Sequence, residues 1–179
     1  MGKEVKRLSI PTIAAHWIVA SFMIGLLGLG LYMEDLERSP FKFELYGIHK
    51  SLGTIALLFI SLRLLWRLKE GALPSVGNMP RWQEVSAKAM HHLLLLMTFV
   101  MPISGIIMNR GGGRALEVFG VEVIAGGEKI EWMQQVGGAA HEFGTNALIA
   151  LLVLHVLAAI KHEFVDKDGT IKRMVGKSQ

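Results

Sequence analysis

Residues 141–155 read HEFGTNALIALLVLH, an apolar run closed at both ends by histidine. His141 and His155 are 14 residues apart, which is ~21 Å along a helix that rises 1.5 Å per residue. At 100° per residue, 14 steps return to within ~40° of the starting direction, so both rings lie on one stripe. Because a metal ion binds its ligands at ~2 Å, the two rings cannot share one ion. The stretch therefore predicts two sites at two depths, each needing a second ligand.

Four apolar segments of similar length organise the chain. They cover residues of about 12–33, 47–67, 88–108 and 137–163. About 20 apolar residues in a helix cross a hydrocarbon layer of ~30 Å, and a chain inside that layer must be helical or part of a closed barrel. The segments lack period-two alternation, so we expect an all-α integral membrane protein. The expected fold is an up-down bundle of four transmembrane helices in one domain, residues 1–179.

Composition excludes several kinds of site and partner. The 179-residue chain is 51% hydrophobic and has no cysteine, which excludes disulfides, iron–sulfur clusters, thiolate zinc sites and c-type haem attachment. Seven histidines remain as nitrogen ligands. The net charge is +4, but the charges lie between apolar runs rather than along one face, so we expect no nucleic-acid partner.

The distribution of lysine and arginine predicts the orientation in the membrane. One side of the predicted bundle carries 13 of these side chains and the other carries 6. The two sets are Lys3, Lys6, Arg7, Arg63, Arg67, Lys69, Arg81, Lys88, Lys161, Lys167, Lys172, Arg173 and Lys177, against Arg38, Lys42, Lys50, Arg110, Arg114 and Lys129. Positively charged loops stay in the cytoplasm, so both termini are expected there. The segment 109–135 is then the longest element on the outer side, where a substrate or partner would meet the protein.

Two further histidines supply the second ligands. His16 lies near the inner end of the first segment, and His49 lies near the outer end of the second. In an up-down bundle, His16 shares the inner level with His155, and His49 shares the outer level with His141. Two histidine pairs at two depths are what two haem b groups require, with one iron between each pair. Ligation by two histidines closes both axial positions, which suits electron transfer rather than oxygen binding.

Other residues on the same stripes have two interpretations each. Gly53, one turn after His49, either lets backbone approach a flat macrocycle or serves ordinary helix packing. Arg63, 14 residues after His49, either pairs with a haem propionate or is an arginine that reaches the interface. His162, two turns after His155, is a candidate quinone or proton site or an interface anchor, and Asp166 is a candidate proton relay.

His91 and His92 open the third segment at the cytoplasmic interface. They are ~100° apart on a helix, so at most one faces inward. Structural or propionate-binding roles are favoured over axial ligation for both residues.

Taken together, the motifs resemble the bacterial cytochrome b561 family over essentially the whole chain. The resemblance is carried by His16-Trp17, Gly28-Leu29-Gly30-Leu31-Tyr32-Met33, His49-Lys50-Ser51-Leu52-Gly53, Arg63-Leu64-Leu65-Trp66-Arg67-Leu68, Pro102-Ile103-Ser104-Gly105, and His155 leading into residues 161–169. It implies axial ligands at His16, His49, His141 and His155, the same set that spacing predicts. It also implies a multi-pass protein of the bacterial cytoplasmic (inner) membrane, with membrane lipid and quinone as partners.

One branch of the family resembles superoxide oxidase, which takes electrons from superoxide and delivers them to ubiquinone. Asn109-Arg110-Gly111 is similar to that branch, and Arg110, with Arg114, Lys42 or Lys50, can steer an anion toward the outer haem. The outer side as a whole carries 9 acidic against 6 basic residues, so any such attraction must be local. The favoured interpretation is an enzyme, a superoxide:ubiquinone oxidoreductase. The alternative is an electron-transfer subunit between quinol and a periplasmic redox partner that docks on residues 109–135.

Overall fold

The structure is a computed structural model that describes residues 7–71 and 80–177. Its elements are α1 (Ile10–Asp35), α2 (Pro40–Glu70), α3 (Arg81–Gly111), β1 (Leu116–Val118), β2 (Val121–Ile124), α4 (Glu131–Phe164) and α5 (Thr170–Met174). In these described ranges, α1 to α4 are long and apolar enough to cross a membrane. The expected four-helix transmembrane bundle is confirmed.

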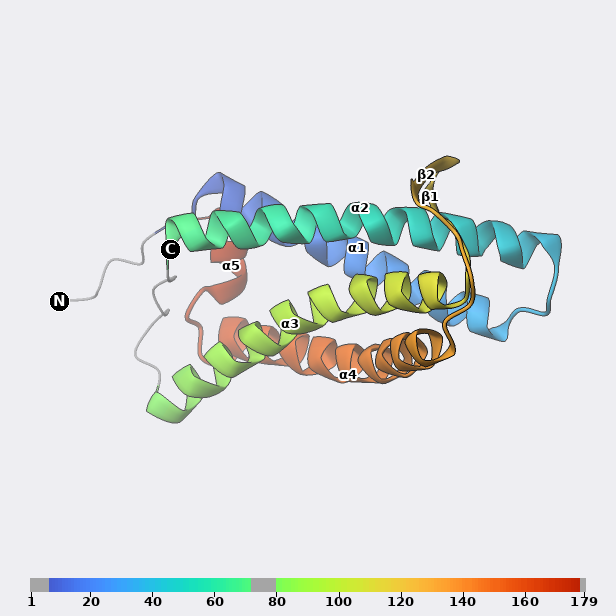
Figure 1. Cartoon of the computed structure of the whole chain (residues 1–179). Coiled ribbons are helices and arrows are strands. Elements are labelled where there is room, and N and C mark those ends of the chain that lie inside the picture. Colours follow the sequence, from blue (N-terminus) through green and yellow to red (C-terminus); the bar gives the residue numbers. More distant parts are fainter. Residues whose placement is uncertain (1–6, 72–79, 178–179) are drawn as a thin grey trace.

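The bundle has two distinct ends (Figure 1). We call the end where α1 begins the inner end, and α5 lies there as well; the end where α1 finishes and α2 begins is the outer end. Placement of the inner end in the cytoplasm stays a prediction from charge, and Lys3 and Lys6 of that argument lie outside the described residues.

The helices extend beyond the apolar runs because capping residues lie further out. Ser39 caps α2 by accepting a hydrogen bond from the Lys42 backbone N–H at 3.2 Å, and Pro40 occupies the first helical turn. Proline suits that position because its missing N–H would have no helical partner there. As a result α2 begins at Pro40 rather than at about residue 47. The apolar run marks only the part of a helix that faces lipid.

The helices associate as two pairs. α1 packs on α2, α3 packs most extensively on α4, and the pairs meet chiefly through α2 and α3. Glycine brings α3 and α4 together, because a Cβ on Gly137 would lie 2.5 Å from the Met108 backbone nitrogen and 2.9 Å from the Ser104 carbonyl oxygen. Small residues at helix contacts are the usual device for close packing in membranes, where lipid is as apolar as leucine.

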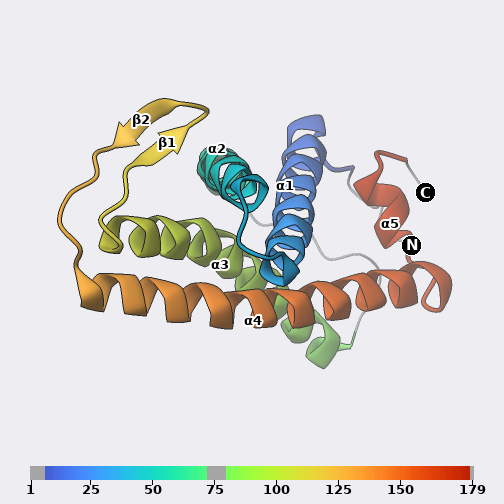
Figure 2. The ribbon, with the colours of Figure 1, turned by 90° about the vertical axis from the view of Figure 1, so that its right-hand side faces the viewer.

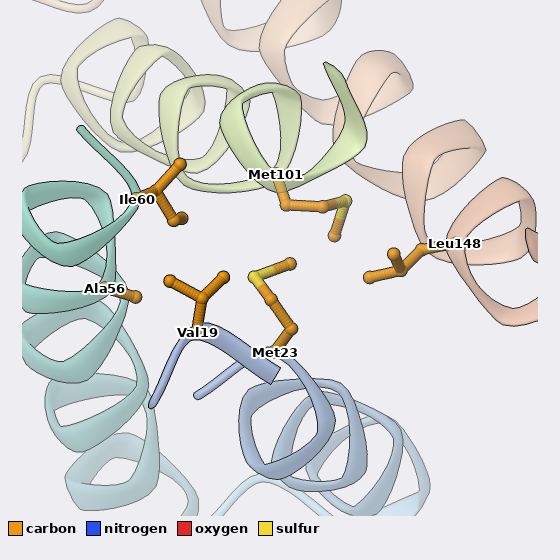
Figure 3. Close-up of a cluster of buried hydrophobic side chains, with 6 residues drawn as sticks. All are labelled: Val19, Met23, Ala56, Ile60, Met101 and Leu148. Atoms are coloured by element: carbon orange, nitrogen blue, oxygen red, sulfur yellow. The ribbon is translucent and has the colours of Figure 1, made fainter. Parts of the chain in front are cut away.

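A layer of apolar side chains fills the middle of the bundle (Figure 3). All four long helices contribute to it, through Val19 and Met23 of α1, Ala56 and Ile60 of α2, Met101 of α3 and Leu148 of α4. Leu148 lies midway between His141 and His155 on α4. The layer therefore separates an outer from an inner level of the bundle.

The outer segment 109–135 contains a β-hairpin that the all-α expectation did not include. β1 and β2 pair antiparallel, and their connection consists of Phe119 and Gly120. The alternation LEV and VEVI around Phe-Gly is a hairpin signal, but each strand is too short to stand out against four long apolar runs. Figure 2 shows the hairpin on the side of α2 away from α1, and β1 contacts both α2 and α3.

At the inner end, α5 folds back onto α1. The Trp17 indole N–H donates to the Met174 carbonyl oxygen at 2.8 Å, and the Glu163 carboxylate accepts from the backbone N–H of Ile171 at 2.9 Å. The start of α1 is also joined to the end of α2, where Thr12 accepts from the Trp66 indole N–H at 2.9 Å and donates to Glu70.

Two neighbouring glycines of α4 test the close contact of α3 with α4. We expect Gly137→Ala to lower the unfolding temperature in detergent, because its Cβ would meet backbone atoms, and such overpacking costs about 1–3 kcal/mol. Gly138→Ala is the matched control, since its Cβ would be 3.7 Å from the nearest contact, the flexible Met108 sulfur. That variant should keep or slightly raise the unfolding temperature, because alanine is the better helix former. Equal unfolding temperatures for the two variants would contradict the packing argument.

Candidate functional site

The outer level of the bundle holds two facing histidines. His49 of α2 and His141 of α4 have ring centroids 6.3 Å apart, with an angle of 76° between the ring planes. Glycines of the other two helices flank them. A Cβ on Gly30 would lie 3.5 Å from His49 Cε1, and one on Gly105 would lie 3.4 Å from His141 Cε1. Gly30 thus lies at the outer level, as its position 14 residues after His16 predicts.

Contacts from α3 orient the His141 ring. Its Nδ1 lies 3.0 Å from the Met101 carbonyl oxygen and 3.1 Å from the Ser104 hydroxyl. A carbonyl can only accept, so Nδ1 carries the proton and donates, and Nε2 keeps its lone pair. An imidazole bound to a metal is usually oriented by such a donation. Sequence reasoning missed Ser104 and Met101 as partners of His141, although Ser104 lies in the quoted Pro-Ile-Ser-Gly motif.

The inner level receives one polar side chain from each of the four long helices. His16 of α1 and His155 of α4 have ring centroids 6.5 Å apart, at an interplanar angle of 54°. His91 of α3 has its ring 5.6 Å from that of His155, and the Arg63 Nη2 of α2 lies 3.3 Å from His16 Nδ1. The pairs predicted from depth are therefore the pairs that face each other. His91 faces inward, whereas His92 bonds the Lys88 carbonyl oxygen of its own helix.

The ring separations discriminate between the possible pairs. A transition metal binds an imidazole nitrogen at ~2.0–2.1 Å, and the ring centroid lies ~1.1 Å further on, so two rings on opposite sides of one ion have centroids ~6.2 Å apart. The separations of 6.3 Å and 6.5 Å fit this value. The ring centroids of His91 and His155 are 5.6 Å apart, which is too short for two rings that bind one metal ion from opposite sides. The ring separations of the two predicted pairs are therefore compatible with an iron ion between the rings, and each pair joins a histidine of the α1–α2 pair to one of α4.

Arg63 makes a contact with His16 that is not expected if His16 binds a metal ion. No carboxylate of the described residues forms an ion pair with it, and a cation inside a membrane bundle needs an anionic partner. Arginine can only donate, so its contact requires His16 Nδ1 to accept and places the proton of neutral His16 on Nε2. Ligation by His16 Nε2 would thus require Arg63 to release the ring and bond another acceptor.

Two candidates remain, the polar cluster around His162 at the inner end and Gly53 near the outer level. His162 Nδ1 lies 2.9 Å from an Asp166 carboxylate oxygen and 3.1 Å from one of Asp168. The hydrogen bond from the Lys161 ammonium holds the pKa of Asp166 below its usual value, which keeps this carboxylate ionised. Gly53 has a different environment, because a Cβ there would meet no protein atom within 4 Å. No contact between protein atoms therefore requires glycine at that position.

One positive side chain, that of Lys50, contacts Asn109 at the outer end. The Asn109 carboxamide accepts from the Lys50 ammonium at 3.4 Å and donates to the carbonyl oxygens of Arg114 and Ala115 at 3.2 and 3.0 Å. Arg110, the next residue, donates to the Glu128 carbonyl oxygen at 3.3 Å. Lys42 is different from these side chains, since its ammonium bonds the Leu36 carbonyl oxygen in the α1–α2 connection at 2.6 Å.

Comparisons with known proteins agree over almost the whole chain. The family model of prokaryotic cytochrome b561 matches residues 7–177. The chain is 34% identical to "Cytochrome b561 homolog 2" of Escherichia coli (strain K12), over 97% of this chain and 93% of that protein. It is 25% identical to "Probable superoxide oxidase CybB" of Yersinia pestis, over 97% and 98% of the two chains. It is 26% identical to "Cytochrome b562" of Cereibacter sphaeroides, over 91% of each chain.

A substitution at the buried Asn109 tests whether its hydrogen bonds order the outer segment. We expect Asn109→Ala to speed amide hydrogen exchange in residues 112–126, because two backbone carbonyls lose their donor, at a cost of about 1–3 kcal/mol. Asn146→Ala is the control, since the Asn146 side chain bonds only the carbonyl oxygen of Glu142 one turn before it on α4. Unchanged exchange in Asn109→Ala would mean that the hairpin alone orders the segment.

Proposed function

Since the chain belongs to the prokaryotic cytochrome b561 family, a family of membrane electron-transfer proteins that bind haem b, we propose that it carries two haems and links the quinone pool to the outer side of the bacterial inner membrane. The observation that carries the proposal is the presence of two facing histidine pairs, with ring separations of 6.3 Å and 6.5 Å. Haem b, when bound, supplies reversible one-electron transfer.

The four histidines would serve as axial ligands, His16 with His155 at the inner level and His49 with His141 at the outer level. Ser104 and the Met101 carbonyl oxygen hold the His141 ring in the tautomer that leaves Nε2 available. The 14-residue spacing on α4 keeps the two levels ~21 Å apart, and the apolar layer of Figure 3 excludes water between them.

We propose that Arg63 binds a propionate of the inner haem. This role supplies the anion that no described carboxylate provides, and it releases His16 Nδ1 from a contact that opposes ligation. Charge-assisted bonds of arginine to a carboxylate are among the stronger hydrogen bonds in proteins. Gly53, whose Cβ would meet no protein atom, would leave space for close approach of the outer macrocycle.

At the inner end, we assign His162 to proton delivery or to binding of the quinone headgroup. It lies two turns beyond His155 and contacts Asp166 and Asp168. The imidazole and the two carboxylates are all groups that can carry a proton, and they lie within hydrogen-bonding distance of one another close to the inner level. Ubiquinone needs two protons for its reduction to ubiquinol, and this arrangement is suited to supplying them.

For the outer substrate, we favour superoxide, and the overall reaction balances for this choice. Two superoxide ions are oxidised to two molecules of oxygen, and their two electrons with two protons convert one ubiquinone to ubiquinol. Support comes from Lys50, which follows His49 directly and contacts Asn109, next to Arg110. A local positive spot at this level attracts an anion even though the outer side is acidic overall.

Replacement of one ligand at a time tests the assignment of the histidines. We expect His155→Ala and His141→Ala each to reduce the ratio of haem to protein by about half, because each removes one of two ligand pairs. His92→Ala is the control, since this exposed ring bonds only its own helix. The haem content of purified protein measures the outcome. Full haem content with an unaltered low-spin spectrum in His155→Ala would overturn the ligand assignment.

The outer substrate is tested with oxidised protein exposed to a superoxide source, with and without ubiquinone. We expect the haem α-band to rise rapidly and ubiquinol to form in proportion to superoxide. Lys50→Gln with Arg110→Gln should slow haem reduction roughly tenfold at low ionic strength. Lys42→Gln removes a charge that is engaged elsewhere and should leave the rate unchanged. Haems that stay oxidised with superoxide but are reduced by quinol would instead favour a conduit to a periplasmic partner.

A further inference from the structure

The tip of the β1–β2 hairpin is clamped onto α2 by one buried side chain. Ser51, which is 3% exposed, accepts from the Phe119 backbone N–H at 3.0 Å and donates to the carbonyl oxygens of Gly47 and Glu117 at 2.9 and 3.4 Å. Leu116 of β1 is buried as well. The hairpin is therefore a rigid extension of α2 rather than a loose loop.

The clamp holds a phenylalanine in a backbone conformation that such a side chain disfavours. Phe119 has φ 48° and Gly120 has φ 86°, as both central residues of a type I′ turn require. Asparagine followed by glycine is the preferred pair for this turn, whereas a bulky side chain at positive φ is rare. The Phe119 side chain also gains little from burial, since 62% of it is exposed. A strained backbone at a residue whose exposed side chain adds little to stability suggests that the residue is kept for a function.

Carboxylates that form no ion pair among the described residues lie near this aromatic side chain. Glu117 and Glu122 lie directly opposite each other across the two strands, where like charges repel. A cavity of about 260 Å³ between the hairpin and the start of α2 is lined by Glu44, Glu117 and Phe119, and the cation Lys50 lines it too. None of the three glutamates forms an ion pair with any residue in ranges 7–71 and 80–177. An exposed aromatic group beside carboxylates that outnumber the one nearby cation is suited to anchoring a basic partner protein.

We propose that the β1–β2 hairpin with Phe119, Glu117 and Glu122, together with Glu44 of the adjacent α2, is the docking site of a soluble electron-transfer protein whose surface carries lysine and arginine around an apolar patch. The proposal rests on the proposed electron transfer at the outer level. Ser51 is two residues from His49, so a protein seated on the hairpin would lie close to the outer haem site. It would exchange single electrons there, by a route separate from superoxide.

A lipid surface is the other occupant that exposed apolar side chains suggest. Charge argues against it, because the three carboxylates of the proposed site would lie in or against a membrane interface that is neutral or negative. Transfer of an ionised carboxylate out of water is costly unless it is paired. A basic protein, in contrast, supplies the missing positive charge.

Binding to the full haem-loaded chain in phosphatidylcholine nanodiscs tests the proposal. The probe is a lysine-rich soluble c-type cytochrome, and an acidic flavodoxin serves as the probe of opposite charge. We expect the basic probe to bind at low ionic strength, to weaken as salt approaches ~0.15 M, and to protect the hairpin from amide exchange. The flavodoxin should not bind.

The decisive variant is Phe119→Asn, because asparagine suits the type I′ turn and keeps the backbone N–H that bonds Ser51. We expect its unfolding temperature to be unchanged or higher and its affinity for the probe to fall roughly tenfold. Glu117→Gln with Glu122→Gln should weaken binding and flatten its salt dependence. Glu34→Gln with Glu37→Gln is the matched control, since it removes two exposed charges at the same end, away from the hairpin.

Three results would overturn the docking site: wild-type affinity in Phe119→Asn, equal loss of binding in the control pair, or insertion of the hairpin into lipid. Because the chain has no cysteine, Val121→Cys provides a single position for a fluorophore, and quenching of that fluorophore by brominated lipid would reveal insertion. Haem content is measured on every variant. A hairpin variant that loses binding but keeps its full haem content tests the docking site alone. Loss of haem in the histidine variants tests the proposed function.

Discussion

The pairing of imidazole rings across an apolar helical bundle is the constraint on which the rest of this structure depends. A histidine inside a membrane is costly unless its nitrogens find partners, and four of the five that lie here at two levels form two pairs, each joining the α1–α2 unit to α4. The ring separations of 6.3 and 6.5 Å match a metal between each pair. Each pair joins a histidine of the α1–α2 unit to one of α4, so a ligand held between the rings would also hold the two helix pairs together.

The packing of the helices determines what surrounds each histidine pair. α3 and α4 approach closely because Gly137 leaves no side chain between their backbones. Close contact places Met101 and Ser104 beside His141 and gives that ring a defined tautomer. At the inner level, the Arg63 cation lies beside His16, and no carboxylate of the described residues forms an ion pair with it. The two levels therefore differ chemically, because the surroundings of His141 are neutral donors and acceptors whereas those of His16 include a charge.

The outer end carries both signs of charge close together. Lys50 bonds Asn109 at the end of α3 and also lines the cavity that Glu44 and Glu117 line. Glu117 and Glu122 project with Phe119 at the tip of the hairpin, which Ser51 holds against α2. Asn109 of α3 and Ser51 of α2 are each buried and bonded to the backbone of the segment between α3 and α4, so this segment is held by α3 and by α2, the helix that carries His49.

The amino-acid sequence by itself determined the four membrane spans, the two depths and the partners of the histidine pairs, because helical rise and twist convert a spacing of 14 residues directly into depth and direction. It also predicted the family. Only the tertiary structure decided that His91 rather than His92 faces His155, that Met101 and Ser104 orient His141, and that the Lys42 ammonium bonds the Leu36 carbonyl oxygen. It alone revealed the hairpin clamped by Ser51. Periodicity defines the stripe on which a residue lies, but contacts between helices depend on how closely and at what rotation the helices pack, and here glycines and buried polar side chains far apart in the chain set that packing.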